Sequence, residues 1–343
     1  MNVLSLNLGS SSLKYAVHAD AQGTLQCKLA RELPTSSQAG EAARTARQAI
    51  ADAVRELGSI EAVGYRIVFG GPHEAPVRVT DELVELLESL QSFDPLHAPG
   101  ALAVMREAEK ILPDAAHVAC FDTAFFRDLP ATARALPIAS SDPILRRYGF
   151  HGLSYEYVVR TLGEKLEKHC IIAHLGNGAS IAALLDGRPV YSTMAFSPLS
   201  GIIMSTRPGD LDPGVLLFLL EREQISVRQL REMLENGSGL RALSGGEADI
   251  QKLCERSDER AEFTIDMFVR CASRAIGALA IELGGIDMLV FTGGIGAHNE
   301  RVRCDIVRRV ASLNQDLAVQ VVETDENLII AHHTAQLAFK QTV

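Results

Sequence analysis

One pattern occurs twice in this chain and constrains its fold more than any other feature. Residues 6–12 read LNLGSSS and residues 174–180 read HLGNGAS. Each stretch follows a short apolar run (3–8 or 171–175) and turns through glycine and small polar residues into a second one (13–17 or 181–185). Glycine allows the positive φ of a tight turn and lets backbone N–H groups approach an anion closely. The repeat therefore predicts two related half-domains that hold phosphate between them.

A third glycine cluster, FTGGIGAHN at 291–299, follows the strand-like residues 288–291. A single glycine-rich turn is usually only a turn. Three such turns, each after an apolar strand, favour a nucleotide-binding or phosphoryl-transfer site.

Length and charge limit the possible partners. A chain of 343 residues suits two domains. Its net charge of -10 argues against a nucleic-acid partner but not against a small anionic substrate, because a few buried arginines can reverse the local potential. The N-terminal residues become polar too early for a signal peptide, and the longest apolar run, 215–220, is too short for a membrane span. The six cysteines show no paired CxxC spacing, so we expect a reducing, cytoplasmic location without zinc or disulfides.

Hydrophobic periodicity predicts an α/β chain. A helix is expected over 81–90, and a longer one over 261–283, ended by Gly284 and Gly285 and followed by a buried strand over 286–291. We expect one face of the long helix to carry Phe263, Met267, Cys271, Ala275, Leu279 and Leu283.

The ends of the second half are also marked. Asp186-Gly187 predicts a hairpin turn between the runs 181–185 and 190–193. A last helix near 329–339 is expected to return to the first domain, which ends near residue 121. Because no low-complexity linker separates the halves, an interdomain cleft without a flexible tether is expected.

Five polar residues stand at element ends among small or apolar neighbours and are candidates for chemistry. They are Asn7, Arg66, Asp122, His151 and Arg207. Burying an isolated carboxylate or guanidinium costs several kcal/mol unless a partner or ligand compensates. Asp122, between Phe121 and the pair Phe125-Phe126, is therefore a functional candidate if it is enclosed.

Each candidate also has a structural interpretation. Arg66 and Asp122 could form a structural ion pair, His151 could be a core histidine and Asn7 could start a turn. Arg207 could lie in a solvated loop, and Lys14 could be a surface lysine on a strand. These interpretations weaken because the residues lie near three phosphate-type loops.

Ten motifs occur in the order found in acetate kinases, and the chain resembles that family from end to end. They are NLGSSSLKY, RIVFGG, DPLH, FDTAF, RRYGFHG, HLGNGAS, MAFSPLSG, TRPGDLDP, FTGGIG and TDENLIIA. The resemblance implies two duplicated α/β domains of the actin-like, ribonuclease H-like type, with a nucleotide cleft between them. On this basis we expect residues 1–121 plus 327–343 to form the acyl-substrate domain. Residues 122–326 would form the nucleotide-binding and dimerisation domain.

The resemblance implies Mg²⁺-dependent, reversible transfer of the ATP γ-phosphoryl group to acetate in a homodimer. By motif position, Asn7 and Glu326 would hold Mg²⁺, an oxygen set that suits this hard ion. Arg66 would pair with the substrate carboxylate, Arg207 and His151 would stabilise the transferring phosphoryl group, and Asp122 matches the catalytic acid. The implied nucleotide-binding residues are Lys14, His174, Leu175, Gly176, Asn177, Gly178, Asp249, Gln251, Gly293, Gly294, Ile295, Gly296 and Ala297.

The methyl pocket implied by the resemblance is walled by Val68, Leu96, Phe150 and Pro198. One methylene is worth only about 1–3 kcal/mol of discrimination, so propionate should be a slow substrate. Acetate is already ionised at pH 7 and needs no general base, so we expect Asp122 to orient Arg66, the metal or a water.

Several positions depart from the family pattern. Tyr65 and Phe69 replace histidines, Phe126, Leu153 and Tyr155 replace polar residues, and Gln251 stands where an arginine contact to the nucleotide is expected. A propionate or butyrate kinase and a non-catalytic ATP-binding regulatory protein therefore remain alternatives. A sugar kinase is disfavoured, because a hydroxyl acceptor needs a base rather than two arginines.

Overall fold

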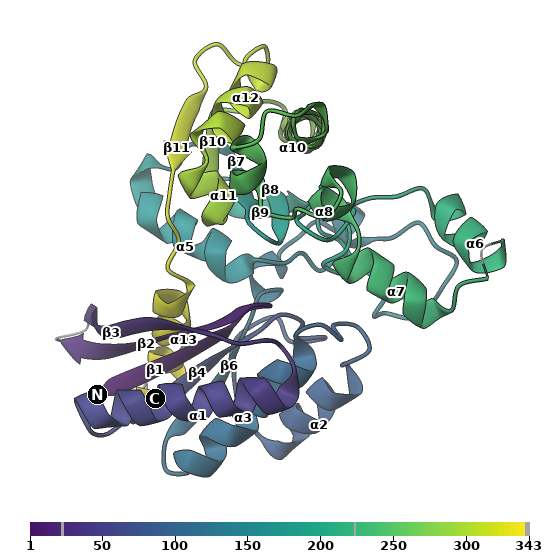
Figure 1. Cartoon of the computed structure of the whole chain (residues 1–343). Helices are drawn as coiled ribbons and strands as arrows, with labels where there is room; N and C mark the ends of the chain where they lie inside the picture. Colours follow the sequence, from purple (N-terminus) through teal and green to yellow (C-terminus); the bar gives the residue numbers. More distant parts are fainter. Residues whose placement is uncertain (22–23, 223, 340–343) are drawn as a thin grey trace. The chain divides into compact units, whose positions relative to one another are not determined.

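The computed structural model of the chain describes residues 1–21, 24–222 and 224–339 (Figure 1). These residues divide into two compact units. Within the described residues, the first comprises 1–21, 24–127, 151–157 and 325–339, and the second comprises 128–150, 158–222 and 224–324. The division differs from the expected one, because residues 122–127, 151–157 and 325–326 pack with the first unit rather than the second.

The first unit is built on a six-stranded sheet of order β3-β2-β1-β4-β6-β5. Strands β1, β4 and β6 run parallel, whereas β2 and β3 complete an antiparallel meander and β5 is an antiparallel edge strand. The strands are β1 (Asn2–Leu8), β2 (Ser12–Ala21), β3 (Thr24–Pro34), β4 (Ala62–Ile67), β5 (Val77–Arg78) and β6 (Ala116–Phe121).

The second unit repeats this plan in a five-stranded sheet of order β11-β10-β7-β8-β9. Here β7, β8 and β9 form the antiparallel meander, and β10 and β11 extend it in parallel. The strands are β7 (His169–Leu175), β8 (Ala179–Leu185), β9 (Arg188–Ser192), β10 (Met288–Thr292) and β11 (Ala318–Val321). Read from the meander outward, the five strands β3, β2, β1, β4 and β6 match β9, β8, β7, β10 and β11 in order and direction, and only the edge strand β5 has no counterpart. This match confirms the two half-domains predicted from the repeated hairpins.

Helices connect and cover the strands of each unit. Those of the first unit are α1 (Ala39–Leu57), α2 (Asp81–Ser89), α3 (Ala98–Ile111) and α13 (Glu326–Phe339), and α5 (Gly152–Leu162) begins there and continues into the second. Those of the second unit are α4 (Ala131–Arg134), α6 (Pro213–Glu221), α7 (Val227–Asn236), α8 (Gly239–Ser244), α9 (Ile250–Cys254), α10 (Glu259–Leu283), α11 (Gly293–His298) and α12 (Glu300–Val310). Short 3₁₀ turns occur at Ala124–Phe126 and Gly163–Lys165.

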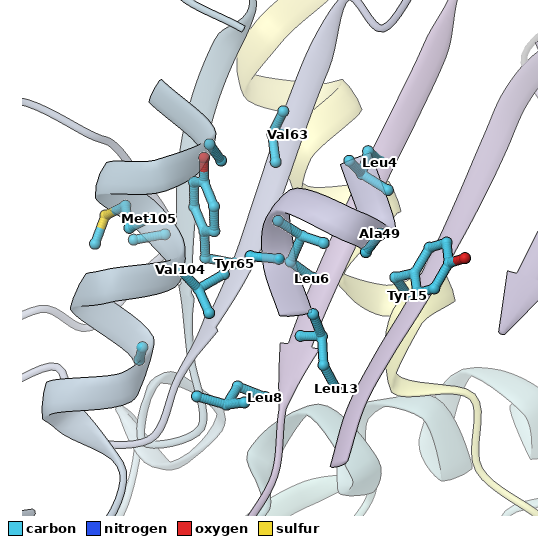
Figure 2. Packing of buried hydrophobic residues seen from close by; sticks show 14 of the residues in the cluster. Leu4, Leu6, Leu8, Leu13, Tyr15, Ala49, Val63, Tyr65, Val104 and Met105 are labelled. Carbon is cyan, nitrogen blue, oxygen red and sulfur yellow. The ribbon is translucent and has the colours of Figure 1, made fainter. Parts of the chain in front are cut away.

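Helices lie on both faces of the sheet of the first unit (Figure 1), and its central strands β1, β4 and β6 are mostly buried. Successive side chains of a strand point to opposite faces, so Leu4, Leu6 and Leu8 of β1 pack against α1 and α3, as Figure 2 shows with Ala49 and Met105. Val3 points the other way, into a cluster with Ala331 of α13. The last helix therefore returns to the first unit, as expected, and covers one face of its sheet.

The prediction of which residues form the apolar face of the long helix α10 is wrong. Phe263 is 56% exposed, and of the six residues proposed for that face only Leu279 is buried. Residues four apart advance by about 40° around an α-helix, so a run of such steps spirals away from any one face. The buried face instead alternates three- and four-residue steps and comprises Ala261, Thr264, Ile265, Phe268, Val269, Ala272, Ile276, Leu279 and Ala280.

The other expected elements are present with small shifts at their ends. α2 begins at Asp81 after the cap Thr80, α10 ends at Gly284 in the left-handed conformation, and Asp186-Gly187 turns β8 into β9. Among the described residues, no helix has both the length and the apolar character that crossing a membrane requires.

Candidate active site

Asn7, Arg66 and Asp122 come together in the first unit because three parallel strands end at one sheet edge. Asn7 lies near the end of β1, Arg66 near the end of β4 and Asp122 directly after β6. Strand alternation places each on the face that α13 covers, since Val3, Gly64 and Cys120 precede them on that face and contact α13 residues. The first residue of α13, Glu326, joins them.

Two hydrogen bonds fix Arg66 on Asp122. Arg66 Nη2 and Nε donate to Asp122 Oδ2 over 2.7 and 3.0 Å. Asn7 links the pair to α13, because its Oδ1 accepts from Arg66 Nη1 at 3.4 Å and its Nδ2 donates to Glu326 Oε2 at 2.8 Å. The Asp122 side chain is only 1% exposed, and its Oδ1 is buried without a hydrogen bond from the described residues.

The cluster has more carboxylates than cations. Burial would lower the pKa of Arg66, but Asp122, Glu326 and Asp94 outweigh it and raise that pKa above its usual value. Burial also raises the pKa of Asp122, and Glu326 adds to this effect while Arg66 opposes it. We take the pair as ionised, because both guanidinium bonds converge on one carboxylate oxygen. One guanidinium thus faces three carboxylates, a setting that favours a further cation.

His151 reaches the same edge through an unusual backbone conformation. Its φ is 61°, and the next residue, Gly152, donates its N–H to the carbonyl of Asp122 at 3.0 Å. A Cβ on Gly152 would lie 2.1 Å from that carbonyl oxygen, so only glycine permits this approach. The His-Gly pair therefore holds α5 against Asp122.

Sequence reasoning missed the buried Asp94 and the half-buried His97 beside this cluster, although it quoted their motif. Asp94 is 4% exposed and accepts a 2.8 Å hydrogen bond from His97 Nδ1. The negative charge of Asp94 helps to raise the pKa of Arg66, and the nearby His97 opposes the rise in the pKa of Asp122. The spacing of three residues between an acid and a histidine was the available signal. Val68 and Leu96 also lie in this unit, whereas Phe150 and Pro198 belong to the second.

The second unit brings two of the glycine clusters together. β7 and β10 are parallel neighbours with His174 opposite Thr292, so residues 175–178 and 293–297 leave the same sheet edge. Gly293 has a φ of 76°, and a Cβ there would lie 2.6 Å from the carbonyl oxygen of Leu175. The third cluster is therefore a strand–glycine–helix junction rather than an open loop, because residues 293–298 form α11.

Arg207 lies in the same unit and is 9% exposed. Its Nη1 donates to the carbonyl of Pro198 at 2.9 Å. The nearby Ser205 donates its hydroxyl to Asn177 Oδ1 and its backbone N–H to Asn177 O, each at 3.2 Å. The segment that carries Arg207 is thereby fastened to the second glycine loop, and the solvated-loop interpretation of Arg207 is wrong.

The remaining candidates for nucleotide binding, Asp249, Gln251 and Lys14, do not all lie in the same unit. Asp249 caps α9, accepting from Gln251 N at 2.9 Å, and Gln251 receives a hydrogen bond from Asn299 in the second unit. Lys14 lies in the first unit, exposed and opposite Asn7 in the β1–β2 register. Cross-strand partners lie on the same sheet face, so Lys14 shares the face of Asn7.

Comparison with known proteins identifies the family and the fold of the chain. The sequence profile of the Acetokinase family matches residues 28–340. The chain belongs to the acetokinase family. An acetate kinase from Rhizobium meliloti is 38% identical over 386 residues, covering 98% of each chain.

Solved structures of this family have the same fold. A propionate kinase from Francisella tularensis superimposes with a TM-score of 0.87 at 27% identity, covering 98% of this chain and 99% of that one. An acetate kinase from Porphyromonas gingivalis gives a TM-score of 0.83 at 29% identity, with the same coverage. The actin-like fold expected from the motifs is thus confirmed.

Proposed function

We propose that this acetokinase-family protein is an acetate kinase, which reversibly transfers the γ-phosphoryl group of ATP to acetate and forms acetyl phosphate and ADP. The observation that carries the proposal is the guanidinium of Arg66, whose side chain is only 14% exposed, fixed by Asp122 and placed two residues before the apolar, buried Val68. A cation beside an apolar wall is what a short carboxylate requires, since one end is charged and the other is methyl.

The chemistry that this site must perform is electrostatic. A carboxylate nucleophile carries no proton at neutral pH, so no residue has to remove one. The obstacle is the approach of an anion to an anionic phosphate, which positioned cations reduce. Arg66 would bind the acceptor carboxylate, and Arg207 and His151 would stabilise charge on the transferring phosphoryl group. Asp122 would orient Arg66 rather than move protons, because its Oδ2 is already engaged by the guanidinium.

Magnesium fits the acidic cluster of the first unit. Mg²⁺ prefers oxygen ligands, usually one or two carboxylates together with waters and substrate phosphates. Asp122 Oδ1 is buried without a hydrogen bond from the described residues, and the Glu326 carboxylate and Asn7 amide are adjacent. Within the described ranges no group of three or more His, Cys, Asp or Glu side chains could hold a metal ion, so the proposed site depends on the mixed set of two carboxylates and one amide. Mg²⁺ would neutralise phosphate charge, and Asn7, Asp122 and Glu326 would hold it.

The nucleotide is assigned to the second unit. Backbone N–H groups of residues 176–178 and 293–294 would contact phosphates, with His174 and Asn177 beside them. The close backbone contact between Gly293 and Leu175 fixes the two segments relative to each other. This arrangement supports a nucleotide substrate more than a lone structural turn would.

Homodimerisation is part of the proposal. The helix α6 has no buried residue within the chain, although Val215, Leu217 and Phe218 are large and apolar. Such a cluster on the surface marks an interaction site. Charges of both signs flank it on α6 and α7, as a self-complementary surface needs, whereas the net charge of -10 disfavours an anionic membrane. We assign a second copy of the chain to this surface, and we expect a cytoplasmic enzyme.

The first experiment is acyl phosphate formation by the purified protein with ATP and Mg²⁺, trapped with hydroxylamine. Acetate, propionate and butyrate are compared at equal concentrations. The proposal predicts the highest kcat/KM with acetate and a loss of about ten- to 200-fold for each added methylene that the pocket rejects. Val68→Ala should narrow the difference between acetate and propionate, and Val63→Ala in the core serves as a stability-matched control.

Two other outcomes are distinct. Faster turnover of propionate than acetate would identify a propionate kinase, the second candidate, which the similarity to the Francisella tularensis propionate kinase favours. Nucleotide binding without turnover of any acid would instead indicate a regulatory ATP-binding protein.

A further inference from the structure

Asn299 lies between α11 and α12 and contacts a third helix, α9. Its side chain is buried at 5% exposure, and its Oδ1 accepts from Val302 N at 3.0 Å, which caps α12. Its Nδ2 donates to Gln251 Oε1 at 3.1 Å and to Cys254 Sγ at 3.5 Å, both on α9. One buried amide therefore joins α9 to the end of the third glycine cluster.

The capping bond fixes the orientation of two side-chain amides. A backbone N–H can only donate, so the atom of Asn299 that faces Val302 N must be its oxygen. Its NH₂ group then faces Gln251, which must present its own oxygen in return. The Gln251 side chain is exposed, and its Nε2 makes no hydrogen bond to any described residue. Asn299 thus forces Gln251 to present an N–H donor outward.

The outward donor lies away from the phosphate-type turns. Gly293, at the start of α11, contacts the backbone of Leu175, whereas Asn299 follows the other end of the helix. Six helical residues span about 9 Å, which is more than the distance across one phosphate group. Arg303 keeps this end in place, because its Nη1 donates to Gly296 O at 3.0 Å and to Ala297 O at 2.7 Å.

We propose that Asn299 is a positioning residue for nucleotide recognition, which holds Gln251 so that its amide NH₂ donates to an acceptor on the nucleoside part of the bound nucleotide. The proposal rests on the nucleotide site assigned above. A neutral donor at this point contributes to base or ribose binding and adds no positive charge for the phosphates.

The test is calorimetric binding of Mg·ADP and of magnesium pyrophosphate to the full chain and its variants. Asn299→Asp keeps the oxygen that caps α12 but replaces the donor that faces Gln251, so the Gln251 amide turns and loses its outward N–H. We expect Asn299→Asp and Gln251→Ala each to weaken ADP binding by about three- to tenfold, the usual contribution of one neutral hydrogen bond. Pyrophosphate binding and the KM for acetate should stay at the wild-type values.

The double variant separates a positioning role from a structural one. If Asn299 acts through Gln251, the double variant binds ADP no more weakly than Gln251→Ala alone. The matched control is Asn314→Asp, because Asn314 also accepts from a backbone N–H and donates to a carbonyl, but next to Ile286 before β10. This control should bind ADP like the wild type.

Three results would overturn the inference. They are additive losses in the double variant, an equal loss for pyrophosphate, and wild-type ADP affinity in Gln251→Ala, whose exposed side chain leaves the helix cap intact. Failure of the proposed function looks different. A wild-type protein that shows the expected binding pattern but forms no acyl phosphate would contradict the kinase assignment and leave the role of Asn299 standing.

Discussion

At the scale of single residues, Arg207 tests the assignment of transition-state charge. Its side chain is 9% exposed and donates to the Pro198 carbonyl, so it is held in place in this structure without a substrate. We predict that Arg207→Ala lowers kcat by about 10²–10³-fold, as loss of a positioned transition-state donor does, with little change in the KM for acetate. Initial rates in the hydroxamate assay measure both constants, with Arg270→Ala on the exposed face of α10 as the control. An unchanged kcat would remove Arg207 from this role.

Glu326 tests the metal assignment. Glu326→Gln keeps an oxygen that can accept from Asn7 Nδ2 but removes one charge from the cluster. We predict at least a roughly tenfold rise in the Mg²⁺ concentration for half-maximal activity, because the hard ion loses a carboxylate ligand. The comparison is Asp325→Asn, a neutralisation one residue earlier that keeps the oxygen bound to Leu328 N. Equal magnesium dependence in the two variants would argue against Glu326 as a ligand.

His18 predicts a pH dependence of stability. It is 1% exposed on the α13 face, and neither ring nitrogen has a hydrogen bond from the described residues. Burial lowers the pKa of His18 below 6.5, while Asp325 opposes and His332 adds to this effect. The unfolded chain therefore binds the proton more readily, and stability is lost as the pH falls below 6.5 towards the lowered pKa.

The measurement for His18 is the free energy of unfolding in urea from pH 8 to pH 5. His18→Phe should lose less stability than the wild type over the acidic part of this range. His298→Gln, at a side chain that is 66% exposed, should follow the wild type. Parallel curves for all three proteins would exclude His18 as the source.

At the scale of elements, substitutions at two glycines distinguish the effect of backbone strain from that of packing. Gly284 ends α10 and Gly293 begins α11, and both have a φ of 76°. A Cβ on Gly284 would meet nothing within 4 Å, whereas one on Gly293 would meet the Leu175 carbonyl. We predict that each Gly→Ala variant loses about 1–2 kcal/mol through the left-handed backbone. Only Gly293→Ala should also lose ADP affinity, because α11 must move away from β7. Equal ADP binding in the two variants, measured by calorimetry, would contradict this junction as part of the nucleotide site.

Much of the element-scale organisation could be predicted from local pattern. The duplicated hairpins, the ends of α2 and α10 and the turn at Asp186 depend on glycine conformation and short-range periodicity, which the sequence displays directly. The buried face of α10 could not be predicted from steps of four, because such steps drift around the helix. The domain boundary could not be predicted from local sequence either, because Gly152 joins the first unit through a tertiary hydrogen bond to the Asp122 carbonyl.

In the candidate site, too, residues marked by local sequence pattern could be predicted, whereas residues that depend on tertiary contacts could not. Arg66 and Asp122 stand out in sequence as charges in otherwise apolar segments, and the parallel strands that end beside them bring them to one edge. Asp94 and Asn299 do not stand out, because an aspartate or asparagine in a loop is usually exposed. Their burial and their hydrogen bonds to His97 and Gln251 exist only after the chain has folded.

At the scale of the whole molecule, the unpartnered surface of α6 predicts a second copy of the chain. Leu217 and Phe218 are 57% and 54% exposed on a helix that buries none of its residues, and water is a poor solvent for such a cluster. The 37.1 kDa chain should therefore sediment as a dimer, and Leu217→Glu with Phe218→Glu should shift it to the monomer mass. Ile281→Glu is the control, because Ile281 is a single apolar residue, 83% exposed, on α10. If Ile281→Glu dissociates the dimer and the α6 variant does not, the interface lies on the long helix instead. Because the proposed catalytic residues lie on other elements, the monomeric variant should keep its affinity for ADP, which separates assembly from nucleotide binding.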